Sequence, residues 1–251
     1  MRERVNLLNI VVDKVKTEEV IREIFEAIEK GEKKHIVFVN ALKVYLVDKD
    51  PELKKSIFDA DLVLPDGMPI VWISRLFNRQ LPERICGTDL FEILLKECEN
   101  RNKSVYFLGS KDEILKKMLN VINRTNPKLR IAGFRNGYFS DFDDDNIINE
   151  INNSKADILF IGISSPKKEI WAYKYKTKIN TPVVMGVGGS FDVLAGVVSR
   201  APKWMQKVGL EWFYRVIMEP RRMLGRYLKT NLYFVFVVLK YLINEKFLRK
   251  C

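Results

Sequence analysis

The stretch VVMGVGGSFDVLAG, residues 183–196, places a short apolar run directly before a glycine-rich turn and a second apolar segment. Such a run predicts a buried strand, and the bare backbone of the glycines can approach an anionic ligand closely. Similar pairs of a strand-like run and a helical pattern recur through most of the chain. This alternation is typical of βαβ units and therefore predicts a parallel sheet.

Six short apolar runs predict the strands, because continuous apolar runs are typical of parallel strands that are buried on both faces. They are residues 35–39, 62–64, 104–108, 129–133, 158–161 and 183–187. Apolar residues at helical spacing predict helices at 17–30, 42–60 with a break at Pro51, 68–77, 88–100, 111–122, 144–153 and 166–176. We therefore expect an α/β fold, with a Rossmann-like, mostly parallel sheet and helices on both faces.

The C-terminal fifth of the chain has a different character. From Arg200 onward there are twelve Lys or Arg residues and three acidic ones, so this part carries +9 of the net charge of +11. The alternation of strands and helices stops, and successive helices are predicted on both sides of Pro220. We therefore divide the chain into an α/β core, residues 1–197, and a basic helical appendage, residues 198–251.

The appendage contains the longest apolar run, Leu232–Leu239, which Lys240 interrupts. A helix needs roughly 20 apolar residues to cross a bilayer, so we expect this one to lie on an anionic membrane surface. Packing on the core or on a second copy of the chain is the alternative. Nucleic-acid binding is disfavoured, because Phe234 and Phe236 lie inside the apolar run instead of alternating with the charges.

The location of the protein is predicted from its N-terminus and its cysteines. The N-terminal residues show no export signal. The three cysteines match neither a disulfide framework nor a zinc site, which indicates a reducing compartment. We therefore expect a cytoplasmic protein.

Ligands of open parallel sheets bind beyond the carboxyl ends of the strands. Asp66, in LPDGMPIVW, follows the predicted strand 62–64 and is the best candidate for a catalytic base, although Pro-Asp-Gly is also an ordinary turn. Arg84, in LPERICGTDL, lies in the next connection. Its guanidinium suits a phosphate or carboxylate, with a plain surface arginine as the alternative.

Two other loops are candidates for anion binding. GISSPKKEIW, residues 162–171, begins a helix whose N–H groups, with Lys167 and Lys168, suit a phosphate or sugar hydroxyl; a simple capped helix explains the serines equally well. The glycines at 186–189 match a dinucleotide fingerprint only in part. The third glycine is missing, and Lys207 stands near the position of the expected acid, which disfavours a nicotinamide-dependent oxidoreductase.

No metal site is predicted. His35 is the single histidine and lies in a predicted strand, so we expect it to be buried in the core. The acidic cluster of Asp141, Asp143, Asp144 and Asp145 superficially resembles a metal-binding motif, but a solvated cap at the start of the next helix explains it better. We expect neither a metal nor another cofactor.

Several motifs together resemble the WecG/TagA/CpsF family of glycosyltransferases. In family order and over nearly the whole chain, they are LPDGMPIVW, LPERICGTDL, NGYF, GISSPKKEIW, GVGGSFDVLAGVVSRAPKWMQKVGLEW and YRVIMEPRR. The resemblance implies transfer of a sugar, commonly of the N-acetylmannosamine type, from a UDP-sugar to a polyprenyl-diphosphate-linked sugar. It places this reaction at the inner face of the bacterial membrane, in the synthesis of surface polymers such as teichoic acid.

The resemblance also assigns the site residues. It implies that Asp66 is the general base of an inverting transfer that needs no metal. The sugar or acceptor pocket would be lined by Asn40, Arg84 and Lys168. The nucleotide would contact Tyr138, Gly188, Gly189 and Asp192. The diphosphates would bind Arg215, Arg222 and Arg226, so that the appendage closes the active site.

Two positions depart from the family pattern. Phe38 stands where the family often has threonine, and Lys168 where it often has glutamine. The first change removes a hydroxyl, and the second adds a charge that favours an acidic or differently substituted sugar. The resemblance therefore implies the reaction class and leaves the donor sugar open. A nucleic-acid-binding module and a nucleotide-dependent oxidoreductase are the alternative functions.

Overall fold

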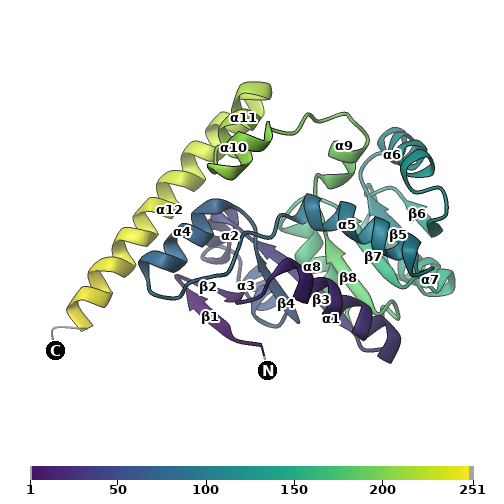
Figure 1. Ribbon diagram of the computed structural model, residues 1–251, viewed down its shortest axis with the longest axis horizontal. Coiled ribbons are helices and arrows are strands. Elements are labelled where there is room, and N and C mark those ends of the chain that lie inside the picture. Colours follow the sequence, from purple (N-terminus) through teal and green to yellow (C-terminus); the bar gives the residue numbers. More distant parts are fainter. Residues whose placement is uncertain (1, 249–251) are drawn as a thin grey trace.

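The structure, a computed structural model, describes residues 2–248 except for the side chains of residues 141, 222 and 245–248. Its centre is a six-stranded sheet with the order β4-β3-β8-β7-β5-β6, in which all neighbours are parallel (Figure 1). The strands are β3 (Lys34–Val39), β4 (Leu62–Pro65), β5 (Ser104–Gly109), β6 (Arg130–Arg135), β7 (Ile158–Gly162) and β8 (Val183–Gly186). Each overlaps a predicted strand, so the expected Rossmann-like α/β fold is confirmed.

Helices cover both faces of the sheet. One face packs against α1 (Thr17–Lys30), α5 (Gly87–Asn100), α6 (Asp112–Thr125) and the short α9 (Ser190–Leu194). The other face packs against α2 (Ala41–Val47), α3 (Pro51–Phe58), α4 (Met68–Leu76), α7 (Asp144–Ser154) and α8 (Lys167–Lys174). A short 3₁₀ helix, η1 (Asp141–Asp143), precedes α7. The loops at the carboxyl ends of the strands therefore rest on a covered, rigid sheet.

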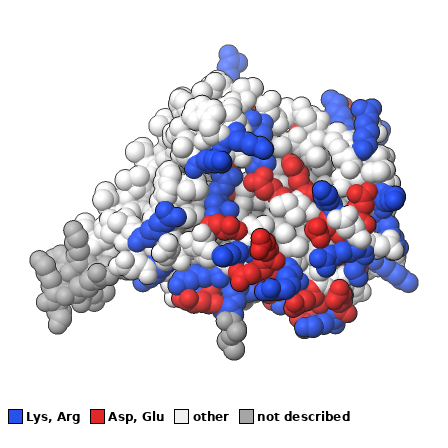
Figure 2. Space-filling model, in the orientation of Figure 1, with Lys and Arg blue, Asp and Glu red and all other residues white. Residues whose placement is uncertain are grey.

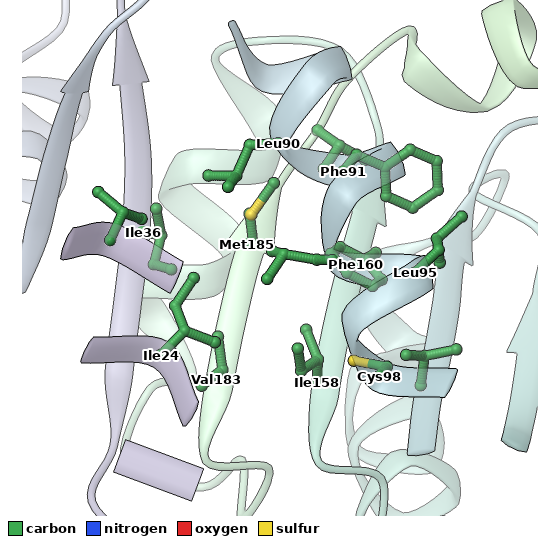
Figure 3. Close-up of a cluster of buried hydrophobic side chains, with 14 of the residues drawn as sticks. Ile24, Ile36, Leu90, Phe91, Leu95, Cys98, Ile158, Phe160, Val183 and Met185 are labelled. Carbon is green, nitrogen blue, oxygen red and sulfur yellow. The ribbon is translucent and has the colours of Figure 1, made fainter. Parts of the chain in front are cut away.

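The apolar core under α5 holds the central strands in place. In Figure 3, Phe91 and Leu95 of α5 lie over Phe160 of β7, and Met185 of β8 lies beneath the same helix. The rings of Phe91 and Phe160 meet edge to face, with centroids 4.9 Å apart. Full burial of one such side chain contributes about 1.5–3 kcal/mol. Strands β7 and β8, which lead into two of the candidate loops, are thus among the best anchored.

Local sequence signals explain where α1 ends and where α3 begins. Helix α1 has the predicted bounds, and Gly31 ends it with φ 67°, a left-handed conformation that glycine adopts without strain. The predicted break at Pro51 is also confirmed. The carboxylate of Asp50 accepts the N–H of Leu53 at 3.0 Å, and Pro51 occupies the first turn of α3, where it needs no N–H partner.

An N-terminal hairpin was not predicted. It consists of β1 (Arg4–Leu7) and the antiparallel β2 (Ile10–Asp13). Every residue of β2 is buried, so the sequence lacks the alternation that marks a half-exposed strand. Buried Asp13 accepts from Arg4 Nε at 2.7 Å and from the N–H of Val63 at 2.7 Å, which ties the hairpin to β4.

The C-terminal helices are α10 (Lys203–Lys207), α11 (Glu211–Met218) and α12 (Pro220–Leu248). Helix α12 begins at Pro220 as predicted, packs along α2 and projects beyond the core (Figure 1). Its two faces differ: Phe234 and Val237 are buried against the hairpin and α2, whereas Leu232 and Phe236 are 70% and 60% exposed. One face therefore packs on the core, and the other remains open.

Charges of both signs are mixed on the surface of the core. On the face shown in Figure 2, acidic and basic side chains crowd the lower part of the core. Within residues 2–248, no helix is both long and apolar enough to cross a bilayer.

Candidate active site

Asp66 and Asn40 lie next to each other at the carboxyl edge of the sheet. Val39 of β3 is in register with Pro65 of β4, so the residues that follow these strands come together. The N–H of Asp66 donates to the carbonyl of Val39 at 2.8 Å. Asn40 Oδ1 accepts the N–H of Lys43 at 3.2 Å and so caps α2. Strand pairing thus brings the predicted base beside a predicted sugar-binding residue.

The surroundings of Asp66 favour its protonated form. Burial raises the pKa of this carboxyl group, and the positive charge of Arg84 opposes the rise. The negative charge of Glu211 raises the pKa further, while Arg215 and a hydrogen bond with Asn40 lower it. A carboxylate with a raised pKa accepts a proton more readily than a solvated one. Asp66 therefore has the environment of a general base.

Arg84 connects this site to the C-terminal helices. Its Nη1 donates to the carbonyl of Gln206 at 3.2 Å, and its Nη2 lies 3.5 Å from Glu211 Oε2. Arg215, one turn farther along α11, lies 3.5 Å from Oε1 of the same carboxylate. Glu211 is thus held between an arginine of the core and an arginine of the appendage, close to Asp66.

A buried ionic cluster lies between α2 and α8. Glu169 Oε1 is 2.5 Å from both Lys43 Nζ and Lys168 Nζ, and these side chains are only 3%, 3% and 10% exposed. Ser165 Oγ accepts from Lys43 Nζ at 3.0 Å, donates to Glu169 at 3.1 Å and also accepts from Lys168 Nζ. The cluster therefore contains two cations and one anion.

The titration of the cluster follows from burial and charge. Burial lowers the pKa of Lys43 to about 7, although Glu169 opposes this effect. Burial alone would raise the pKa of Glu169, but the two ammonium groups lower it to about 2. The carboxylate is therefore ionised at neutral pH, while the charge of Lys43 is only weakly held.

Lys168 links the cluster to the glycine turn after β8. A methyl group on Gly186 would come within 3.0 Å of the Lys168 side chain, and one on Gly188 would lie 3.8 Å from its Nζ. Gly188 has φ 56°, which favours glycine. Its N–H donates to the carbonyl of Ile161 at 3.2 Å, so Gly188 offers a ligand close approach but not a free donor.

The predicted nucleotide residues lie farther along the sheet edge. Tyr138 follows β6, but its loop folds back over the sheet: the N–H of Gly137 donates to the carbonyl of Ser110 at 2.9 Å, and a methyl group on Gly137 would lie 3.1 Å from the side chain of Ile163. Tyr138 is 72% exposed. Gly188 and Gly189 follow β8, which lies between β4 and β6 in the sheet, and Asp192 lies in α9. The residues predicted for the sugar and those predicted for the nucleotide therefore follow one another along the sheet edge instead of forming one cluster.

The three arginines predicted to bind diphosphates lie on α11 and α12. Arg215 is beside Glu211 at the Asp66 site. Arg226 is exposed on α12, close enough that its charge, after burial and Lys168, helps to lower the pKa of Lys43. Arg222 is also in α12, but its side chain is outside the described part of the structure. The structure thus brings one of these arginines close enough to Asp66 to lower the pKa of its carboxyl group.

One expectation about the acidic cluster is wrong. Asp144 is not a solvated cap: it is 3% exposed and accepts from Trp171 Nε1 at 2.7 Å and from Tyr175 Oη at 2.6 Å. The packing of α7 on α8 buries two aromatic donors, which need an acceptor. His35 is buried as predicted, and burial lowers its pKa to about 4. In the described part of the chain, no three His, Cys, Asp or Glu residues are grouped so as to hold a metal ion.

Comparison with known proteins identifies the family. Residues 5–247 match the model of the glycosyl transferase WecG/TagA/CpsF family. The chain belongs to the WecG/TagA/CpsF family. The protein is therefore a glycosyltransferase, and the resemblance seen in the sequence is confirmed.

Two Bacillus members of the family are similar to this chain. Both carry the name N-acetylglucosaminyldiphosphoundecaprenol N-acetyl-beta-D-mannosaminyltransferase. The protein of Bacillus subtilis strain 168 is 34% identical over 184 residues, which cover 73% of this chain and 71% of the relative. The protein of Bacillus spizizenii is 34% identical over 174 residues, which cover 69% of this chain and 67% of the relative.

Three charged residues of the site were missed at the sequence level. Lys43, Glu169 and Glu211 stand in helical segments where charged residues are usually solvated. A signal did exist for Lys43, because it shares the buried face of α2 with Val44 and Val47. A lysine at an apolar helical position indicates a buried partner.

Proposed function

We propose that this WecG/TagA/CpsF enzyme transfers a sugar of the N-acetylmannosamine type from a UDP-sugar to a polyprenyl-diphosphate-linked sugar. The transfer inverts the anomeric carbon and uses no metal ion or other cofactor. The names of the Bacillus relatives support the donor sugar and the acceptor. The observation that carries the mechanism is the position of Asp66, a carboxyl group with a raised pKa among Arg84, Glu211 and Arg215.

In the proposed reaction, Asp66 accepts the proton of the acceptor hydroxyl. The hydroxyl oxygen forms a bond to the anomeric carbon, while the bond from that carbon to the diphosphate of UDP breaks and its electron pair leaves with UDP. One displacement of this kind inverts the anomeric centre. General base catalysis contributes typically 10²–10⁴-fold to such a step. Asn40 and Arg84, which both interact with Asp66, hold the sugar or acceptor next to it.

The departing diphosphate needs positive charge in place of a metal ion. We assign this role to Arg215, Arg222 and Arg226 of the appendage, and to the close approach that Gly188 and Gly189 allow. Fixed cations aimed at a leaving group stabilise the transition state without reorganisation. The nucleoside then extends along the sheet edge towards Asp192 and Tyr138.

The donor pocket differs from the usual family pattern at two positions. Phe38 is 7% exposed, and its ring is 3.5 Å from the position of a methyl group on Gly87, so it fills core space under α5. Lys168 is paired with Glu169, which it shares with Lys43. When both lysines are protonated, the cluster carries one net positive charge, which supports an acidic sugar as the second donor to test.

We further propose that the enzyme works in cell-surface polymer synthesis as a cytoplasmic protein on the inner face of the membrane. The open apolar face of α12, with Leu232 and Phe236, supports contact with an anionic lipid surface. The same face is also available to a second copy of the chain. Nothing in the site favours a nucleic acid as partner.

The proposal is tested by measuring UDP release from UDP-N-acetylmannosamine, its epimers and its uronic acid, with a short polyprenyl-diphosphate-linked sugar as acceptor. We expect turnover in the presence of EDTA, and we expect Asp66→Asn to lower kcat at least about a hundredfold. Asp145→Asn is the matched control, because the Asp145 side chain is 78% exposed and forms a surface ion pair with Lys178. Full activity of Asp66→Asn would refute the assigned base, and loss of activity in EDTA would refute the absence of a metal.

A further inference from the structure

An apolar groove of about 200 Å³ lies between α11 and α12. Residues that line it include Trp212, Val216, Leu224, Tyr227, Leu228 and Leu232. Leu228 and Leu232 are 55% and 70% exposed, and Asn231 is the polar residue of the lining. Contiguous apolar surface of this kind marks a place where a protein binds an apolar partner.

The groove follows the direction of the helices. On α12 its residues recur every four positions from Leu224 through Leu228 to Leu232, and on α11 Trp212 and Val216 are one turn apart. The rings of Trp212 on α11 and Tyr227 on α12 pack together with centroids 6.0 Å apart. The groove therefore runs between two helices with an apolar lining from both, which suits a flexible hydrocarbon chain.

The part of the groove at Trp212 and Tyr227 adjoins the proposed active site. Trp212 directly follows Glu211, which is paired with Arg84 and Arg215. Tyr227 lines the groove and also lies close enough to Arg215 for the two side chains to influence each other's charge. A ligand with an anionic head at the arginines would therefore place an attached chain at the mouth of the groove.

We propose that this groove binds the first isoprene units of the polyprenyl chain of the acceptor. The inference rests on the proposed function, which places the acceptor sugar at Asp66 beside Asn40 and Arg84, next to the groove. It assigns different roles to two parts of the open apolar surface. The slot between α11 and α12 selects the chain of the substrate, whereas the remainder of α12, such as Ile243, is left for the bilayer.

The test uses acceptors that share one sugar diphosphate and carry a methyl, a geranyl or a farnesyl group, in a solution without detergent or vesicles. We expect the KM of the farnesyl acceptor to be at least about tenfold below that of the methyl acceptor, because the chain buries apolar surface in the groove. Leu228→Gln should remove this advantage. The control is Leu76→Gln on α4, since Leu76 is 54% exposed and outside the groove; it should keep the advantage.

The ratio of the two KM values, rather than activity itself, is the readout, so a general loss of activity does not imitate the result. The proposal is overturned if chain length has no effect on wild-type KM, or if both leucine variants lose the advantage equally. It is also overturned if sedimentation shows that wild-type chains associate through the groove and that Leu228→Gln acts only by separating them.

A second measurement distinguishes failure of the groove from failure of the proposed function. Binding of farnesyl diphosphate is followed by quenching of tryptophan fluorescence, without any donor. In one outcome, no acceptor is turned over, but farnesyl diphosphate still binds, and Leu228→Gln abolishes this binding while Leu76→Gln does not. This outcome supports the groove as a binding site for the isoprene chain and refutes the proposed reaction. Equal binding of farnesyl diphosphate to both variants refutes the proposal that the groove binds the isoprene chain.

Discussion

Replacing Glu169 by glutamine tests the buried cluster beside the proposed donor pocket. The substitution keeps the shape of the side chain and removes the single anion between Lys43 and Lys168, which both lie 2.5 Å from Oε1. All three side chains are almost fully shielded from water. Two cations would then share a buried site without a counterion.

The expected cost follows from this burial. Removing one partner of a buried ion pair destabilises a protein by roughly 3–5 kcal/mol. We expect the lower end, about 3 kcal/mol, because Lys43 has a pKa of about 7 and can release its proton when the carboxylate is gone. For a chain of this length, about 3 kcal/mol corresponds to a Tm lower by about 6–12 °C.

Thermal and urea unfolding of the purified variants measure this difference. The matched control is Glu97→Gln, since Glu97 pairs with Arg101 at 3.1 Å on the surface of α5 and should matter by less than about 0.5 kcal/mol. The double variant Lys43→Met, Glu169→Gln should regain at least about 1 kcal/mol over the single one. Equal stability of Glu169→Gln and Glu97→Gln, or no recovery in the double variant, would show that the cluster is not a coupled ionic unit.

The remaining predictions concern backbone space and pH. Gly109→Ala should destabilise the fold by more than about 3 kcal/mol, because Gly109 has φ 145° and the new methyl group would lie 2.4 Å from the backbone of Gly162. Gly225→Ala, which meets nothing within 4 Å in α12, should be neutral or gain up to about 1 kcal/mol, and equal thermal unfolding of the two would contradict this reasoning. Burial lowers the pKa of Lys43 in the folded protein from 10.5 to about 7. Above pH 7, Lys43 is therefore mostly neutral in the folded protein and still protonated in the unfolded chain. Relative to Lys43→Met, wild-type stability in urea should therefore rise from pH 7 to pH 9, by up to about 2 kcal/mol, and parallel curves would refute it.

The strands and helices of the core could be predicted because each leaves a local pattern. Helix α1 shows it best, since its apolar spacing and its terminal Gly31 fix both ends. The N-terminal hairpin could not be predicted, because tertiary contacts bury every residue of β2 and remove the alternation. For α12, the sequence showed apolar residues almost all round, and only the packing of Phe234 and Val237 reveals which face is open.

The candidate site was predictable only where residues follow strand ends. Asp66 could be found from its place after β4. The partnership of Lys43 with Glu169 could not, because it depends on the order β3-β8-β7, in which residues far apart in the chain become neighbours. Glu211 illustrates the same limit: its position in α11 looks like an ordinary exposed helix start, and only the docking of the appendage places it beside Arg84.

The charges around Asp66 indicate what the appendage contributes to the proposed chemistry. Helix α11 brings both Glu211, which raises the pKa of Asp66, and Arg215, which lowers it. These two residues are also paired with each other, so the helix adds charges of opposite sign whose effects on the carboxyl group partly cancel. Burial is the largest single cause of the raised pKa, and the arginine of the core opposes it. The appendage therefore adds little net charge around the proposed base, and we propose that Arg215 instead serves the negative charge that develops on the leaving diphosphate.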